Sequence, residues 1–161
     1  MKMGSYLNPG SERFKTSLRS QIYVDKTLLI AQVNRYVRTE QRFICVSRPR
    51  RFGKSMAADM LSAYYSTGED TSTLFEGLKI SKDESFKEHL NRYDVIKINV
   101  QEFLSATHNV DEMLKALQRR VLAELKQAYP GVAEGEQLIW VMMDVYAQTV
   151  SYTHLRAHET R

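Results

Sequence analysis

A short loop that contains glycine and lysine, residues 48–55, sets the narrowest limits on how this chain folds. It follows an apolar run, residues 42–47, whose β-branched and aromatic residues predict a strand buried on both faces. The loop itself reads Arg-Pro-Arg-Arg-Phe-Gly-Lys-Ser, and a helix is predicted from Ser55 to about Ser66. A strand, a loop of this kind and a helix, in this order, are typical of a phosphate-binding loop.

The residues at the end of the loop suit a nucleoside triphosphate. Gly53 lets the backbone approach a phosphate because no Cβ stands in the way. Lys54 supplies a positive charge for the β- and γ-phosphate oxygens, and the Ser55 hydroxyl is a ligand for Mg²⁺. The following helix adds its dipole and its N–H groups. We therefore predict a site for ATP and Mg²⁺, with Ser55 as the metal ligand, formed by Arg50, Arg51, Phe52, Gly53, Lys54, Ser55 and Met56.

Basic residues gather around this loop. The chain has 23 basic and 19 acidic residues and a formal charge of +4, a mild excess of which much lies in Arg48, Arg50, Arg51 and Lys54. Such a cluster suits either phosphate groups or the backbone of a nucleic acid. We favour phosphate because the neighbouring residues fit a nucleotide loop. Arg50 and Arg51 are predicted either to contact phosphates or to anchor the loop. Arg48 stands where the usual motif has its first glycine.

The other segments alternate between helical and strand patterns. A second strand is predicted at residues 95–100, and residues 74–80 are predicted to be compact and irregular. Asp25 is a candidate N-cap for the first of four further helices. Strands that alternate with helices indicate an α/β fold with a parallel sheet. The four predicted helices span residues 28–37, 85–90, 110–129 and 138–148.

Single residues add little chemistry. The lone cysteine, Cys45, is predicted to be a small buried hydrophobe, and it is compatible with a reducing cytoplasm. His89 and His108 are predicted at the surface, whereas Trp140 and the tyrosines are predicted in the core rather than as a platform for stacking bases. No apolar stretch is long enough to cross a membrane. We expect a cytoplasmic protein.

The last residues resemble a translated sequencing adapter rather than a natural protein. Residues 151–160 read Ser-Tyr-Thr-His-Leu-Arg-Ala-His-Glu-Thr, which matches the translation of a transposase-end adapter. We exclude this tail from fold reasoning, including the helical spacing of His154 and His158. The natural protein is expected to continue beyond about Thr149. The expected organisation is a polar segment at 1–20, part of a P-loop ATPase domain at 21–149, and the tail at 150–161.

Four segments together resemble the AAA-ATPase-like family of bacterial P-loop proteins, which often carry a nuclease-like domain of the PD-(D/E)XK type at the C-terminus. These segments are the loop Ser-Arg-Pro-Arg-Arg-Phe-Gly-Lys-Ser, the upstream Tyr-Val-Asp-Lys-Thr at 23–27, Leu-Phe-Glu-Gly-Leu-Lys-Ile at 74–80, and the predicted strand at 95–100. The resemblance covers residues 14–149. It places Asp25 and Lys26 near the nucleotide, although a helix cap explains Asp25 as well.

The resemblance implies a P-loop NTPase fold of the additional-strand type, truncated before the Walker B strand. Residues 138–146 are then the helix before that strand. It also implies that the parent protein hydrolyses ATP, while this fragment binds it weakly and does not turn it over. Because strands that lie between the two predicted ones would be lost, the fragment is expected to be marginally stable. The alternative is a basic nucleic-acid-binding module with a vestigial nucleotide site.

Overall fold

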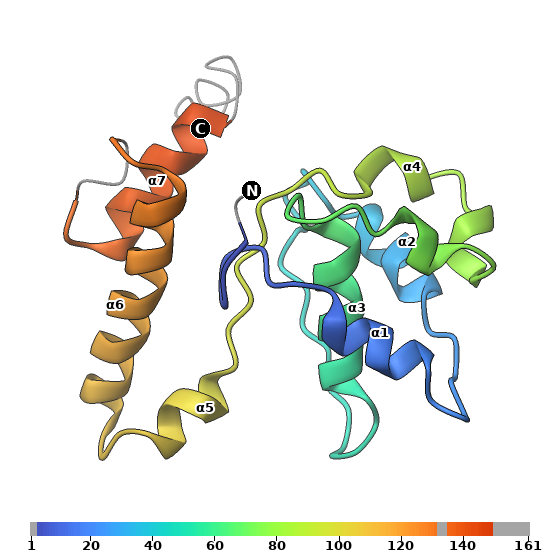
Figure 1. Cartoon of the computed structure of the whole chain (residues 1–161), viewed down its shortest axis with the longest axis horizontal. Helices are drawn as coiled ribbons and strands as arrows, with labels where there is room; N and C mark the ends of the chain where they lie inside the picture. The colour runs from blue at the N-terminus through green and yellow to red at the C-terminus, as the bar shows by residue number, and fades with distance from the viewer. Residues whose placement is uncertain (1–2, 132–134, 150–161) are drawn as a thin grey trace. The chain divides into compact units, whose positions relative to one another are not determined.

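Helices are the main regular secondary structure in the described residues. The computed structural model describes residues 3–131 and 135–149, and within these ranges it contains helices, loops and two isolated β-bridges but no β-sheet (Figure 1). The chain divides into two compact units, Met1–Lys97 and Ile98–Arg161. None of the helices in the described residues is long and apolar enough to cross a membrane.

The first unit is built from short helices around the longer helix α3. Helix α1 packs directly on α3, and one short 3-10 helix, η2, contacts both α2 and α4. Helix α3 follows Gly53, whose left-handed backbone (φ 76°) ends the preceding loop. The elements of this unit are α1 (Glu12–Leu18), α2 (Leu28–Asn34), α3 (Lys54–Tyr65), η1 (Ser72–Phe75), η2 (Lys79–Lys82) and α4 (Phe86–His89).

Aromatic rings form the centre of the first unit. Tyr64 on α3 is fully buried, and its ring meets the rings of Tyr65, Phe75 and Phe86 at centroid distances of 4.8, 5.6 and 6.0 Å. Phe14 of α1 stacks on Phe75 at 5.1 Å. These contacts join α1, α3, η1 and α4, so that segments with little helical propensity of their own are held by one shared core.

The two ends of the first unit are joined. Leu7 and Ile96 form an antiparallel bridge, and the Asn8 N–H donates to the Val95 carbonyl at 2.7 Å. The side chain of Asn8 is completely buried and bonds to Asp94, to Ser66 and to the Val95 N–H. The segment before α1, which contains Leu7 and Asn8, is therefore an integral part of this unit, although it lies in a polar part of the sequence.

The second unit contains α5 (Val100–Ser105), α6 (Val110–Ala128) and α7 (Leu138–Thr149). Helix α6 contacts both α5 and α7, and it begins at Asn109, whose side chain accepts a hydrogen bond from the Glu112 N–H at 2.8 Å. The buried side chains come from all three helices and the turn after α6. They are Phe103, Met113, Val121, Leu125, Tyr129, Val141 and Val145.

The predicted α/β fold with a parallel sheet is wrong. Residues 42–47 form no strand, and Phe43 is 85% exposed while Ile44 and Val46 are about half exposed. Residues 95–100 contribute one bridge, and Val100 already begins α5. A strand needs a neighbour for its N–H and C=O groups, and the two predicted strands do not pair with each other in the described ranges.

Most of the predicted helices are confirmed. The patterns at 28–37, 55–66, 85–90, 110–129 and 138–148 correspond to α2, α3, α4, α6 and α7, with ends that differ by a few residues. The irregular segment at 74–80 overlaps the two 3-10 helices η1 and η2. The amphipathic spacing of these segments was therefore a better guide than the apolar runs, because a helix forms its backbone hydrogen bonds within itself.

Four single-residue predictions were wrong. Cys45 is exposed rather than buried. His89 is buried, and its Nδ1 lies 2.6 Å from the Tyr93 hydroxyl, whereas His108 is exposed as predicted. Trp140 is 57% exposed. Asp25 does not cap α2, because the residue at the N-cap position is Thr27 and no side chain caps this helix.

We expect one ion-paired carboxylate of this unit to contribute to stability in a pH-dependent way. Glu69 accepts hydrogen bonds from Lys15 Nζ and Ser11 Oγ, both at 2.7 Å, and these bonds lower its pKa from the ordinary value of 4.5. A carboxyl group whose pKa is lowered by folding stabilises the fold above its ordinary pKa. This stabilisation is lost as the pH falls through the lowered value.

The difference in unfolding free energy between the wild type and Glu69→Gln should therefore be largest above a pH of about 4.5 and shrink below it. Urea unfolding at a series of pH values measures this difference. Glu76→Gln, at an exposed position in the same unit, serves as the control. A difference that does not change with pH would show that the ion pair has no such role.

Candidate phosphate-binding site

The loop before α3 curls tightly at its end. Arg51 and Gly53 both have left-handed backbones, with φ of 67° and 76°, and α3 begins at Lys54. Glycine adopts this conformation freely, whereas for arginine it is strained. The loop therefore turns the chain sharply into the first turn of α3, where backbone N–H groups have no partner within the helix.

The ammonium group of Lys54 is held by the loop that precedes it. Its Nζ donates to the Arg48 carbonyl and, at 3.1 Å, to the Pro49 carbonyl. The loop thus wraps around a positive charge at the N-terminus of a helix, where the helix dipole adds further positive potential. Neutral carbonyl groups can be exchanged for an anion at little cost, because an anionic acceptor makes a stronger hydrogen bond with an ammonium group.

A second lysine reaches the same loop from elsewhere in the chain. Lys26 Nζ donates to the Phe52 carbonyl at 3.1 Å. A Cβ added at Gly53 would lie 3.3 Å from this Nζ, closer than an ordinary van der Waals contact. The absence of a side chain at Gly53 therefore leaves room for the ammonium group of Lys26. Motif spacing alone did not find Lys26; only the family resemblance placed it near the nucleotide.

The neighbouring Asp25 holds the Lys26 segment in place. One of its carboxylate oxygens accepts from the N–H and the hydroxyl of Thr27, at 2.8 and 2.6 Å, and the other accepts from the Lys79 N–H at 2.8 Å. Burial raises the pKa of Asp25. The hydrogen bonds from Thr27 and Lys79 together lower this pKa by more than burial raises it, so the pKa of Asp25 is below its ordinary value. Asp25 is therefore a charged anchor between α2 and η2.

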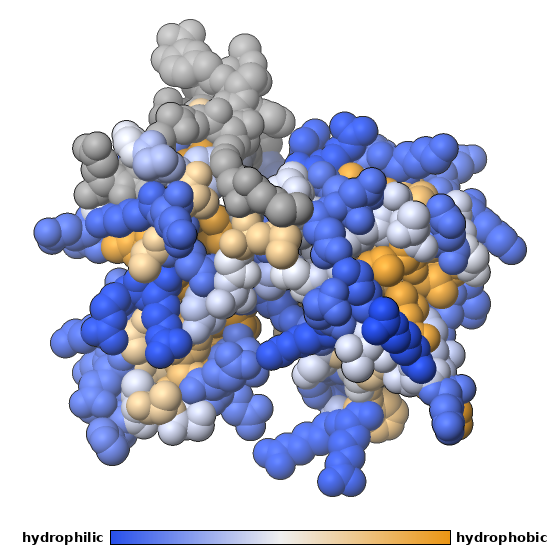
Figure 2. All heavy atoms as spheres, viewed as in Figure 1, coloured by the Kyte–Doolittle hydropathy of each residue, from blue (hydrophilic) through white to orange (hydrophobic). Residues whose placement is uncertain are grey.

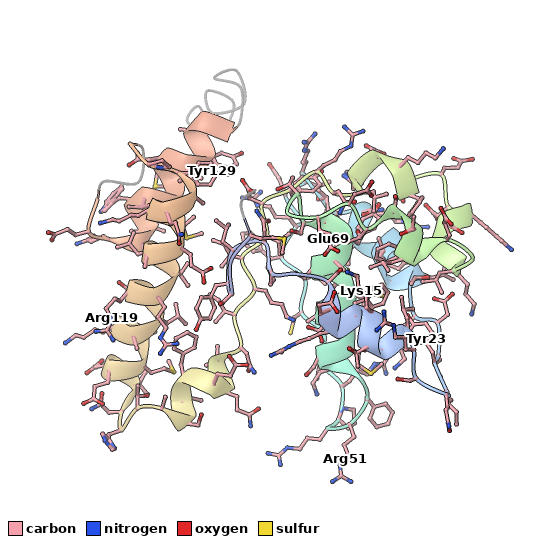
Figure 3. All side chains as sticks on the ribbon, in the orientation of Figure 1. Lys15, Tyr23, Arg51, Glu69, Arg119 and Tyr129 are labelled. Carbon is pink, nitrogen blue, oxygen red and sulfur yellow. The ribbon has the colours of Figure 1, made fainter. Side chains whose placement is uncertain are left out.

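The predicted site residues lie together at the surface. Gly53 is partly buried, and the other six predicted residues are exposed. Figure 3 shows Arg51 at the outer end of the loop, with its side chain directed away from the helices. Arg50 and Arg51 are both exposed.

Metal ligands are sparse around the loop. Ser55 is exposed in the first turn of α3, as a ligand of a phosphate-bound metal would need to be. Asp59 lies four residues further along α3, and its carboxylate is paired with Lys97 Nζ. Among the described residues no group of three or more histidines, cysteines or acidic residues is placed to hold a metal ion. A cation at Ser55 would therefore need ligands from a bound phosphate.

A basic loop that ends in glycine, lysine and serine and opens a helix is typical of proteins that bind phosphate groups. A family model described as Predicted AAA-ATPase matches residues 10–156, and the chain belongs to this family. The resemblance inferred from the sequence motifs is thereby confirmed. No curated protein and no solved structure matches the chain.

Proposed function

We propose that the chain binds ATP with Mg²⁺ through the loop at the start of α3. The observation that carries this proposal is the position of Lys54, whose ammonium group lies within the loop and donates to the Arg48 and Pro49 carbonyls. Membership in a family of predicted ATPases supports ATP as the ligand. The phosphates of ATP would replace the two carbonyls as acceptors of the Lys54 N–H groups.

The residues present fit this ligand. Gly53 offers a backbone without a Cβ, the first turn of α3 offers N–H groups, and the exposed Ser55 hydroxyl offers one oxygen ligand to the metal. Arg50 and Arg51 add positive charge beside the phosphates, and Phe52 and Met56 flank the loop. When bound, Mg²⁺ neutralises charge on the β- and γ-phosphate oxygens.

Binding is the activity that we propose for the described residues. Hydrolysis also needs a carboxylate that orients the metal and a group that activates the attacking water. Among residues 3–131 and 135–149 no group of three or more histidines, cysteines or acidic residues is placed to hold a metal ion. ATP hydrolysis by the whole protein is a proposal that rests on the description of the family.

Removing the charge of Lys54 is expected to weaken the binding of ATP with Mg²⁺ by about 100-fold or more, since a charge-assisted hydrogen bond of about 1.5–3 kcal/mol and long-range attraction are both lost. Calorimetric titration of the wild type and of Lys54→Ala measures this. Lys87→Ala, an exposed lysine on α4, is the matched control and should bind as the wild type does. Equal affinity in all three proteins would contradict the proposal.

The exposed arginines of the loop suit a second function, the binding of a nucleic acid, which the Lys54→Ala variant also tests. Arg50 and Arg51 are exposed and could contact the backbone of a nucleic acid. Binding of a DNA duplex that depends steeply on salt and survives Lys54→Ala would support this alternative. Loss of DNA binding in Arg50→Ala and Arg51→Ala would locate the nucleic acid on the loop.

A further inference from the structure

An open apolar pocket lies directly beside the loop. Its volume is about 310 Å³, within the usual range of small-molecule sites, roughly 300–1,000 Å³. Two fully buried side chains, Phe14 of α1 and Met60 of α3, contribute to its lining. Exposed apolar side chains line it as well, namely Ile22, Val24, Phe52 and Met56.

The pocket shares residues with the proposed phosphate site. Arg51, Phe52, Gly53 and Met56 belong to both, and Lys26 lines the pocket while it donates to the Phe52 carbonyl. A ligand in this pocket is therefore continuous with a ligand on the loop. Figure 2 shows hydrophobic residues that reach the surface between hydrophilic ones on the unit that holds α1 and α3.

The charge of the lining selects the class of ligand. Lys26 and Arg51 are its two cationic residues, and none of the residues that line it is acidic. Asp25, next in sequence to Lys26, directs both carboxylate oxygens to Thr27 and Lys79 instead. An apolar pocket with a positive edge suits a ligand with a flat apolar body and an anionic end.

We propose that this pocket holds the base and the sugar of the nucleotide whose phosphates lie on the loop. The inference rests on the proposed function and adds which part of the chain binds the rest of the ligand. The base would stack on Phe52, with Ile22 and Met56 beside it. Stacking on aromatic and apolar side chains holds any purine, because every base has a π-face.

The polar side chains of the lining are those of Ser17, Tyr23, Lys26 and Arg51, and none of them is buried. The Ser17 hydroxyl donates to the Arg13 carbonyl in its own helix, and the Lys26 ammonium group donates to Phe52. Strong discrimination between similar ligands requires buried polar groups that one ligand satisfies and the other does not. Without such groups the affinities for ATP and GTP should agree to within about tenfold.

The test compares ligands that differ in the base. Calorimetry with the Mg²⁺ complexes of ATP, GTP and inorganic tripolyphosphate separates the pocket from the loop. Phe52→Ala should weaken the binding of ATP and GTP by about tenfold more than it weakens the binding of tripolyphosphate, as expected for a lost base–aromatic stack. Phe43→Ala is the matched control, an even more exposed phenylalanine outside the pocket. Ile22→Ala is a second variant, at a side chain that is 87% exposed and so contributes little to the core.

Each outcome decides between the two proposals. If tripolyphosphate binds in a Lys54-dependent way but ATP binds no more tightly, and Phe52→Ala and Ile22→Ala change nothing, the pocket inference is overturned while the loop remains a phosphate site. If ATP is preferred over GTP by more than about 100-fold, base-tolerant stacking is wrong. If neither ATP nor tripolyphosphate binds, the proposed function falls and the pocket inference falls with it.

Discussion

Tyr64→Ala is expected to lower the free energy of unfolding of the first unit by about 3–5 kcal/mol, the usual cost of removing a large aromatic side chain from a core. Tyr64 is completely buried and contacts three aromatic rings. Its hydroxyl also donates to the Phe86 carbonyl at 2.7 Å and accepts from Asn34 Nδ2 at 3.2 Å. The substitution removes the packing of α3 against η1 and α4 together with these bonds.

Urea unfolding followed by near-ultraviolet circular dichroism measures this loss, since the signal reports the packing of the tyrosines. Tyr64→Phe keeps the ring and removes the hydroxyl, so it should cost only about 1–2 kcal/mol. The two variants thus separate ring packing from hydrogen bonding. A loss below about 1 kcal/mol in Tyr64→Ala would show that this ring is not central to the core.

Asn8→Ala is expected to cost about 2–5 kcal/mol for two additive reasons. Asn8 has a left-handed backbone (φ 47°), which an alanine adopts only at a cost of about 1–2 kcal/mol. Its buried amide also donates to Asp94 at 2.7 Å and accepts from the Val95 N–H at 2.8 Å. In Asn8→Ala the Asp94 carboxylate loses its donor and the Val95 N–H loses its acceptor. Leaving them unsatisfied costs a further 1–3 kcal/mol, roughly.

Asn8→Gly is the control that separates the two contributions. Glycine adopts the left-handed conformation freely, so this variant should lose the hydrogen bonds but avoid the backbone strain. It should therefore be more stable than Asn8→Ala by about 1 kcal/mol in the same urea experiment. Equal stability of the two variants would mean that the backbone at position 8 relaxes, and a wild-type-like Asn8→Ala would show that the amide contributes nothing.

The sequence predicted five of the seven α-helices in the described residues, all but α1 and α5, because their signal is local. The spacing of apolar residues along α6 and the polar residue before it, Asn109, are sufficient to mark its start. The formation of a strand is not determined by its local sequence alone. The apolar residues of 42–47 satisfy the strand pattern, yet a strand is stabilised by a partner that the pattern cannot name. The same limit explains Cys45, which was predicted to be buried because its run was.

The residues of the candidate site were predicted from the sequence, but their contacts with the rest of the chain were not. Motif spacing located the loop and the start of α3, because a glycine followed by lysine and serine has a narrow chemical use. It could not show that Lys54 Nζ would be bound by the loop carbonyls, or that Tyr23 and Ile22 would line a pocket beside Phe52. The pocket residues Ile22 and Tyr23 lie about thirty positions before Phe52 in the sequence, so the pocket depends on how α1 packs on α3.

The pairing of Asn8 with Val95 also bears on the order of events during synthesis. The two residues are 87 positions apart, so a chain made at about 5–20 residues per second produces the second partner roughly 4–17 s after the first. Ser66 is made earlier in that interval, but Asn8 lacks its bonds to Asp94 and Val95 until the end of it. The contact that joins the two ends of the first unit is therefore among the last to become possible during synthesis.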